Sequence, residues 1–272
     1  MRKIMCFFKD LLKRVLFYFV GFSVKQNRFR IRKTLLFNFC AFGWKGAWKT
    51  PIIIYGNTKI YKVGKINIHC EMTRGLVRIG RLNFKSQGET RFCNSGIINI
   101  KGPVRIEGAT IIENFGVITF DGSNLISDGS SILIRTELQM GLHSRLGFHS
   151  LILDSDDHYT IDTGTRKIYK NSKPIKIGAF NWFGNSTFIK KGVVTPDYLI
   201  VASANTLLTK DYSSLPPYSV LGGVPAQIIK SGIRKVFNPH NEREIIKYFE
   251  NNPKITAFDI DSDVDLDVFC AN

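Results

Sequence analysis

Apolar residues recur every six positions along two stretches of this 272-residue chain. The first run is Ile100, Ile106, Ile112 and Ile118, and the second is Ile177, Phe183, Ile189, Thr195, Val201 and Leu207. Small residues often follow the apolar position of the second run, as at Gly178, Gly184 and Ala202. A period of six fits neither a helix nor the two-residue alternation of a plain strand, so it restricts the chain to very few folds.

A six-residue period is typical of the hexapeptide class of parallel β-helix. Each repeat makes one short flat face, with the apolar side chain pointing inward and a small residue helping the chain to turn the corner. Three faces close a triangular coil of roughly eighteen residues, and stacked coils bury a continuous apolar column. An antiparallel sandwich also has short strands and many glycines, but two six-residue registers with small residues at a fixed offset favour the β-helix. The repeats therefore predict an all-β chain.

The chain is strongly basic, with a formal net charge of +16. This charge favours anionic partners such as phosphates, acidic glycans or lipid headgroups. No motif by which proteins recognise nucleic acid occurs in the sequence, so we expect no nucleic-acid partner. The five cysteines are scattered and form no CxxC pair, which indicates a reducing compartment and argues against a disulfide framework or a zinc site.

Residues 1–50 are predicted to form a basic, amphipathic N-terminal extension. Between Met1 and Val24, apolar residues recur at spacings of three and four among lysines and arginines, which predicts a helix with an apolar stripe. The uninterrupted apolar run from Val15 to Phe22 is too short to span a bilayer, and no small-residue cleavage site follows it. Two interpretations stay open: packing on protein, which we prefer, or contact of residues 1–24 with an anionic membrane interface.

The predicted β-helix spans residues 51–230, and residues 231–272 form a C-terminal segment. In this segment, Asn238–His240 has the composition of a turn, and Glu242–Asn251 is predicted to be a short helix. The acidic stretch Asp259–Asp267 is expected to be loosely ordered. We expect the segment to cap the open end of the β-helix.

Several motifs follow one another between Leu151 and Lys230. They are Asp154-Ser155-Asp156-Asp157-His158, Lys173-Pro174-Ile175-Lys176-Ile177-Gly178, Asn181-Trp182-Phe183-Gly184, Thr209-Lys210-Asp211 and Gly222-Gly223-Val224-Pro225-Ala226. In these motifs the chain resembles the hexapeptide-repeat acyltransferases, and more closely the branch that acetylates bacterial surface sugars, antibiotics and small glycosides. A weaker likeness extends back to about Lys33. The motifs are specific for the fold and the acyl donor, and not for the acceptor.

The resemblance implies a left-handed β-helix, against the usual right-handed rule for parallel connections, and a homotrimer. It implies acetyl-CoA as the acyl donor and no metal. The implied reaction is O-acetylation of a sugar hydroxyl in a capsule, lipopolysaccharide, exopolysaccharide or other surface glycan. Such an enzyme is expected in the cytoplasm, and a peripheral position at the inner face of the membrane is the alternative, because a lipid-linked acceptor would lie there.

Acetyl transfer to a hydroxyl requires the hydroxyl proton to leave as the oxygen attacks. A neutral imidazole suits this step, and the resemblance places His158 at the position of the family's general base. If the segment is extended, alternation puts Asp156 on the same face as His158. We therefore expect Asp156 to orient the ring, with Asp157 as the alternative. Direct transfer is expected, because no cysteine or serine stands in an evident nucleophile motif.

The resemblance also assigns the donor site, which in the family is a groove between coils of adjacent subunits. The matching residues are Trp182, Gly184, Asn185, Ala202, Ala204, Thr209, Lys210, Gln227 and Lys230. Trp182 would form an aromatic wall and Lys230 would meet the nucleotide phosphates. The sequence departs from the family pattern at Ser203–Thr206, where Gly-Ala-Gly-Ser is usual, and at Gln227, where many members have a basic residue.

Two alternatives to the O-acetyltransferase stay open: an N-acetyltransferase acting on an amino sugar, and a non-catalytic hexapeptide-repeat binding or scaffold protein. A three-histidine zinc hydratase is disfavoured, because His143, His149 and His158 do not stack on one face of an eighteen-residue coil. An acyl donor longer than acetyl fits the same motifs.

Overall fold

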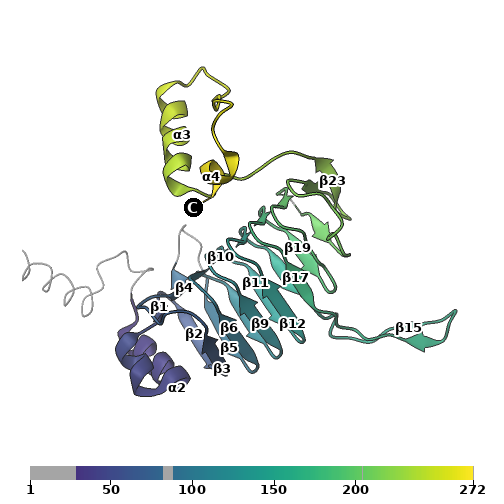
Figure 1. Ribbon diagram of the computed structural model, residues 1–272. Coiled ribbons are helices and arrows are strands. Elements are labelled where there is room, and N and C mark those ends of the chain that lie inside the picture. The colour runs from purple at the N-terminus through teal and green to yellow at the C-terminus, as the bar shows by residue number, and fades with distance from the viewer. Residues whose placement is uncertain (1–28, 82–87, 204, 272) are drawn as a thin grey trace, which may run out of the picture.

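The computed structural model describes residues 29–81, 88–203 and 205–271. Most of this part of the chain winds into a parallel β-helix whose coils stack along one axis (Figure 1). Successive strands pass through three faces in turn. Each face is a sheet of parallel strands from successive coils, except at the C-terminal end of one face, where the last strand runs antiparallel to its neighbour. The predicted all-β, parallel β-helix is therefore confirmed. No helix among the described residues has the length and apolar character needed to cross a membrane.

The strands of the described residues divide among the three faces as follows. The first face contains β1 (Ile52–Ile54), β4 (Val77–Arg81), β7 (Val104–Glu107), β10 (Asn124–Ile126), β13 (Arg145–Leu146), β18 (Trp182–Phe183), β20 (Ile200–Val201), β22 (Val220–Gly222) and β23 (Gln227–Lys230). The second contains β2 (Thr58–Lys62), β5 (Thr90–Asn94), β8 (Ile111–Asn114), β11 (Ser131–Ile134), β14 (Leu151–Leu153), β19 (Phe188–Lys190) and β21 (Leu207–Leu208). The third contains β3 (Lys65–Ile68), β6 (Ile97–Ile100), β9 (Val117–Phe120), β12 (Glu137–Met140) and β17 (Ile175–Ile177).

The coils in the middle of the stack are longer than the repeats predicted. Ile98 pairs with Ile118, and Ile118 with Leu138, so one coil takes twenty residues instead of eighteen. The two additional residues lengthen the second-face strands, which end on an extra buried position such as Asn114 or Ile134. The six-residue spacing holds within one coil. On the next coil of the β-helix the same spacing arrives two residues away from the paired position.

The second run keeps the predicted coil of eighteen residues. Phe183 pairs with Val201, eighteen residues away, and both side chains are buried. The last member of the run is wrong by one residue, because Ile189 pairs with Leu208, and Leu208 is buried whereas Leu207 is half-exposed. One residue added at this corner is enough to turn the neighbouring side chain inward, since side chains of a strand alternate between faces.

The column inside the coils is almost entirely aliphatic. Its fully buried side chains include Ile112, Ile118, Ile126, Ile132, Leu138, Met140 and Phe183. Full burial of each such side chain stabilises the fold by about 1.5–3 kcal/mol. The coils therefore give a rigid frame to the corners that carry polar residues.

Helix α2 (Ile31–Lys49) closes the N-terminal end of the stack (Figure 1). Its buried face combines apolar and polar side chains: Phe37 packs on the Phe92 ring in the core, and Thr34 and Asn38 bond to the edge strand β1. The Asn38 side chain accepts a hydrogen bond from the backbone N–H of Ile52 and donates one to the carbonyl of the same residue. Thr34 accepts another from the N–H of Ile54. Covering an edge in this way prevents it from pairing with other strands. The helix predicted within residues 1–24 lies outside the described residues.

A hairpin loop interrupts the stack between β14 and β17. Paired residues on consecutive coils are thirty-seven apart here, as for Leu151 and Phe188, so about seventeen residues are inserted into one coil of the β-helix. The insertion carries the hairpin of β15 (Ile161–Asp162) and β16 (Lys167–Ile168), which projects from the side of the coils in Figure 1. Its base is held by backbone hydrogen bonds from Asp156 to Asn171 and from Lys173 to Asp154.

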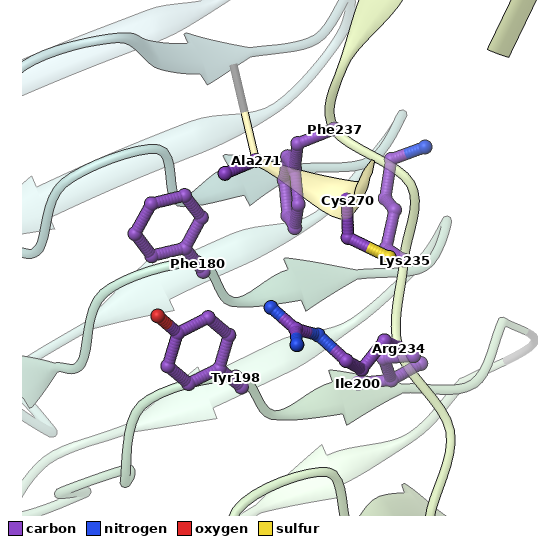
Figure 2. A pocket seen from close by; sticks show the side chains of 8 residues that line it. All are labelled: Phe180, Tyr198, Ile200, Arg234, Lys235, Phe237, Cys270 and Ala271. Carbon is purple, nitrogen blue, oxygen red and sulfur yellow. The ribbon is translucent and has the colours of Figure 1, made fainter. Parts of the chain in front are cut away.

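The C-terminal segment packs along the side of the stack rather than over its open end. Arg234 lies over the Tyr198 ring, and Phe237 packs edge-on against Phe180 (Figure 2). Arg234 also lies over the Tyr218 ring on the following coil. The expectation of an end cap is therefore wrong. Stacked aromatic rings at successive corners provide a continuous strip, and the chain follows that strip.

Two short helices end the described chain, α3 (Pro239–Asn251) and α4 (Leu266–Cys270). The predicted turn Asn238–His240 is the start of α3, because the Asn238 side chain accepts hydrogen bonds from the N–H groups of His240 and Asn241. Asparagine at the N-cap followed by proline is a favoured helix start. Within the acidic stretch expected to be loose, Asp265 caps α4 in the same way.

Candidate active site

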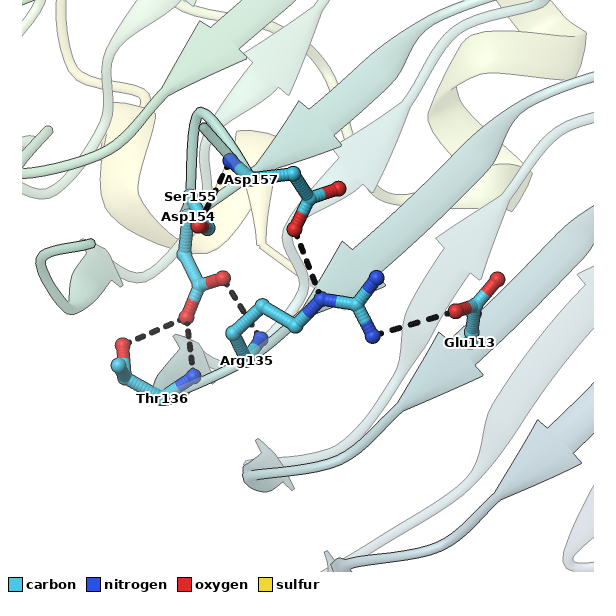
Figure 3. Close-up of polar contacts among 6 residues, drawn as sticks. All are labelled: Glu113, Arg135, Thr136, Asp154, Ser155 and Asp157. Atoms are coloured by element: carbon cyan, nitrogen blue, oxygen red, sulfur yellow. Dashed lines mark hydrogen bonds and ion pairs between the residues drawn. The ribbon is translucent and has the colours of Figure 1, made fainter. Parts of the chain in front are cut away.

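The loop corner is the set of residues that follow the second-face strands β11, β14, β19 and β21. Asp154, directly after β14, is fully buried and anchors it. Its carboxylate accepts hydrogen bonds from the backbone N–H groups of Arg135, Thr136 and Glu137 and from the Thr136 hydroxyl, at 2.6–3.1 Å (Figure 3). A buried carboxylate is stable when its oxygens are saturated in this way, so the loop leaves the coils from a fixed point.

A second contact holds the outer side of the loop. The Arg135 guanidinium donates to Asp157 at 2.9 Å and to Glu113 at 3.2 Å (Figure 3). It also lies over the Phe115 ring. The Asp157 backbone N–H donates to the Ser155 hydroxyl. Asp157 is therefore committed to Arg135 and is not placed against an imidazole.

Asp156 is exposed and forms ion pairs with Lys190 and Lys191. Hydrogen bonds from these two lysines, with that of Lys191 the stronger, lower the pKa of the Asp156 carboxyl. The alternation argument for pairing Asp156 with His158 is wrong, because the segment is not extended. The chain turns at Asp157, whose φ is 58°, and the His158 N–H donates to the Asp156 carbonyl at 2.7 Å.

His158 itself is exposed at the base of the hairpin loop. No described residue forms a hydrogen bond with its ring, so both ring nitrogens face solvent in the single chain. An accessible imidazole on an anchored loop can reach the hydroxyl of a bound molecule. The structure thus places the expected base where a substrate can approach it.

The Trp182 corner is a second set of predicted residues, at the ends of the first-face strands β18 and β20. The Trp182 ring is 40% exposed, and the Lys235 ammonium lies 4.9 Å from its centre. Gly184 is buried against the next coil, where an added Cβ would lie 2.5 Å from the Ser203 N atom. The Asn185 N–H donates to the Ser203 hydroxyl at 3.2 Å. Trp182 thus presents an aromatic ring with the Lys235 ammonium over it, and the backbone at Gly184 is closely stacked on the next coil.

The remaining donor residues lie in three places. Ala202 is half-buried at the Trp182 corner, and Ala204 lies outside the described residues. Thr209 and Lys210 follow β21, so they belong to the loop corner, and the Lys210 ammonium lies 5.6 Å from the Tyr212 ring. Gln227 and Lys230 are both exposed on β23. The structure therefore separates the expected site residues instead of gathering them in one pocket.

The separation follows from the winding of the chain. His158 stands at the corner between the second and third faces, whereas Trp182 lies on the first face, ahead of the corner between the first and second faces. Sequence reasoning missed Arg135 and Lys191 at the loop corner and Lys235 at the Trp182 corner. Their partners come from distant coils, so no local spacing could reveal them.

His143 and His149 do not lie beside His158. His143 stacks on the Phe180 ring, with 4.9 Å between centroids, and burial is the main cause that lowers its pKa. His149 follows the first-face strand β13, at the corner between the first and second faces one coil before Gly184, and its ring packs over Gly129. Among the described residues, no group of three His, Cys, Asp or Glu side chains could hold a metal ion.

No protein-family model matches the chain, and no curated protein matches it. Among solved structures, the polysialic-acid-specific acetyltransferase NeuO is 18% identical, with a TM-score of 0.38, covering 72% of this chain and 99% of its own. The polysialic acid O-acetyltransferase OatWY is 18% identical, with a TM-score of 0.37, covering 71% and 96%. The hexapeptide-repeat acetyltransferase VCA0836 of Vibrio cholerae, solved with acetyl coenzyme A, is 16% identical, with a TM-score of 0.33, covering 74% and 84%. These TM-scores assign neither activity nor substrate to this chain.

Proposed function

We propose that this protein is an acetyl-CoA-dependent O-acetyltransferase that acts on a sugar hydroxyl of a surface glycan, with His158 as the general base. One observation carries the proposal: an accessible imidazole stands on a loop that a buried carboxylate, Asp154, ties to the rigid coils. General-base catalysis needs a proton acceptor of suitable pKa held in a fixed position next to the acceptor group. We propose that His158, at the loop corner, is this proton acceptor.

The reaction is a direct transfer. The neutral His158 ring accepts the proton of the sugar hydroxyl as the oxygen attacks the thioester carbonyl carbon. The tetrahedral intermediate then collapses, the carbon–sulfur bond breaks, and the CoA thiolate takes up the proton. In this scheme Asp156 is a positioning residue, because its ion pairs with Lys190 and Lys191 fix the loop.

The Trp182 corner is proposed to hold the acyl donor. An exposed indole face offers an apolar surface to the pantetheine arm, and the Lys235 ammonium over it places positive charge there for phosphates. Lys230 lies on β23, three strands further along the same face, and would meet the nucleotide phosphates of the donor. Gly184 lets the coils stack closely, so the corner keeps a defined shape. The same site would use Asn185, Ala202, Ala204, Thr209, Lys210 and Gln227.

A complete site then requires two chains. The base and the donor surface are at different corners of one triangular coil, and a copy related by a threefold axis brings its own corners to the first chain. We therefore propose a homotrimer in which the loop corner of one chain faces the Trp182 corner of the next, since closed cyclic symmetry repeats one interface around the ring. The site would form three times in each assembly.

The acceptor is proposed to be an acidic glycan. Exposed lysines surround the hairpin loop, namely Lys167, Lys170, Lys173 and Lys176, and positive charge around a site raises the local concentration of anionic substrates. The proposed location is the cytoplasm, where acetyl-CoA is made. Packing of residues 1–24 on protein stays the preferred prediction, and contact with the inner face of the membrane is the alternative.

The test is CoA thiol release from acetyl-CoA with a panel of neutral, acidic and amino sugars. We expect sugar-dependent release that falls by about 100- to 10,000-fold in His158→Ala, whereas the exposed control His240→Ala keeps the wild-type rate. Release at the wild-type rate by His158→Ala would exclude the proposed base. Release with amino sugars alone would replace the O-acetyltransferase with an N-acetyltransferase, and failure of the chain to bind acetyl-CoA would favour a scaffold protein.

A further inference from the structure

Helix α2 has a second face that no described part of the chain covers. Its side chains include Trp44 and Trp48, which are 82% and 88% exposed, and Leu36, which is 64% exposed. Together with Leu35, Phe39 and Ala47 they line an apolar groove of about 450 Å³, here called the α2 groove. Two indoles exposed to this extent on one helix cost solvation free energy without a partner.

A bend in the helix shapes the groove. Gly43 has φ 66° and ψ −156°, so the helical path breaks there, and no atom lies within 4 Å of the position that its Cβ would take. Glycine is therefore needed for its backbone conformation and not for space. The break brings the Phe39 and Trp44 rings together, with centroids 5.0 Å apart and planes at 71°.

The surroundings of the groove are positively charged. Between Phe29 and Lys49 the sequence has five basic residues and no acidic one: Arg30, Arg32, Lys33, Lys45 and Lys49. Arg30 and Lys33 donate to backbone carbonyls of the first coil, whereas Lys45 and Lys49 flank the tryptophans and are exposed. Over residues 1–49 the count is twelve Lys or Arg against Asp10 alone, which accounts for +11 of the total charge of +16.

This charge distribution selects among the possible occupants of the groove. Residues 1–28 are themselves basic, and a second copy of α2 carries the same charge, so either would add repulsion. At the end of the acidic C-terminal stretch, Asp267 pairs with Arg234 and Asp265 caps α4 of the same chain. A partner with an apolar interior beneath an anionic surface would match both the apolar α2 groove and the basic residues beside it.

We propose that the α2 groove is a docking surface for an anionic lipid bilayer. Tryptophan side chains favour the boundary between headgroups and acyl chains, because the indole has an apolar body and one N–H donor. Lysines beside them are attracted to acidic headgroups. Helix α2 would lie in the interface with its exposed apolar face toward the lipid, and Thr34 and Asn38 would attach it to the coils. The inference is independent of the proposed acetyl transfer.

The chain contains a convenient reporter, since its three tryptophans are Trp44, Trp48 and Trp182. In the full-length Trp182→Phe variant, all tryptophan emission comes from the α2 groove. We expect this emission to shift to shorter wavelength when vesicles of three parts phosphatidylcholine to one part phosphatidylglycerol are added. Pure phosphatidylcholine should produce a much smaller shift, and added salt should weaken the response. An unchanged spectrum with the anionic vesicles would overturn the proposal.

A second measurement uses co-sedimentation of the full-length chain with the same vesicles. Trp44→Ser/Trp48→Ser is expected to lower the affinity at least tenfold, whereas Ile168→Ser/Tyr169→Ser, which removes two exposed apolar side chains from the hairpin, leaves it unchanged. Wild-type affinity in the tryptophan variant would overturn the proposal and transfer membrane binding to residues 1–28. A smaller assembly mass for that variant without vesicles would also overturn it, because the groove would then be an interface between copies.

Discussion

The two corners that carry the predicted site residues differ in the chemistry of their side chains. The loop corner is polar: Asp154 is saturated by four hydrogen bonds, and Asp156 and Asp157 pair with cations from other coils. The Trp182 corner has an exposed indole, a nearby ammonium and a glycine pressed against the next coil. One corner offers a proton acceptor, and the other offers an indole surface with a cation and no base. Each corner supplies what the other lacks.

The largest effect is expected at the anchor of the loop corner. Asp154→Ala leaves three backbone N–H groups without their buried acceptor, and hydrogen bonds to a charged group contribute more than neutral ones. We expect the free energy of unfolding to fall by about 4 kcal/mol, as measured by denaturant unfolding, with loss of activity because the loop is no longer held. Asp197→Ala is the control, because the Asp197 carboxylate accepts a single bond, at an exposed site, from the Ala179 N–H. An equal, small loss in both variants would show that Asp154 is not an anchor.

A pH effect on stability is expected at Glu107, the last residue of the first-face strand β7, several coils before Trp182. Glu107 is buried beside Asp128, and burial, reinforced by repulsion from Asp128, raises its pKa from 4.5 to about 7. The folded protein therefore keeps a proton that the unfolded chain releases. Stability is fully present below about pH 4.5 and is lost as the pH rises through about 7, by about 3 kcal/mol in total.

Glu107→Gln removes this titration. We expect the variant to lose the decline in stability between pH 5 and 8, measured by denaturant unfolding at a series of pH values. Glu250→Gln, on the exposed side of α3, should keep the wild-type profile. If Glu107→Gln retains the wild-type decline, the carboxylate is not the group that titrates.

Close stacking at the Trp182 corner can be tested with one methyl group. Gly184→Ala places a Cβ within 2.6 Å of backbone and side-chain atoms of Ser203, so the coils must separate. We expect a loss of about 2 kcal/mol in unfolding free energy and weaker acetyl-CoA binding by calorimetry. Gly164→Ala in the hairpin meets its nearest atom at 3.4 Å and should change neither. Normal donor binding by Gly184→Ala would remove this corner from the donor site.

The smallest effect is expected from the ion pairs of the loop. Lys191→Met removes the main partner of Asp156, but the pair is exposed, so the unfolding free energy should change by less than about 1 kcal/mol. Because the lysine lowers the pKa of Asp156, that pKa should rise in the variant, as followed by carboxyl chemical shifts in NMR. The activity should decrease a few-fold through a looser loop. A large loss of stability would contradict this description of the corner.

The fold could be predicted from the sequence to the extent that local periodicity determines it. The run from Ile177 to Val201 gave the coil length correctly for the pair Phe183 and Val201. It failed between Ile98 and Ile118, because two residues added to the second-face strand lengthen the coil while the six-residue spacing continues through it. Only the pairing of consecutive coils reveals such an addition.

The candidate site was less predictable, because its contacts are long-range. His158 could be singled out by its motif, but the partners of its neighbours could not. Asp157 binds Arg135, twenty-two positions earlier in the sequence, and Asp156 binds lysines on the following coil. The turn at Asp157 was also hidden, since a non-glycine residue with positive φ has no clear sequence signal. The role of His158 stays a prediction.

The most direct test of the two-corner site is complementation between two inactive variants. His158→Ala keeps the Trp182 corner, and Trp182→Ala keeps the base, so each homotrimer should be inactive. After unfolding, mixing in equal amounts and refolding, a chain with an intact base meets a chain with an intact donor corner at about one site in four. The account predicts recovery of about a quarter of the wild-type rate of thiol release. Mixed assemblies that form but show no activity would contradict a site shared between chains.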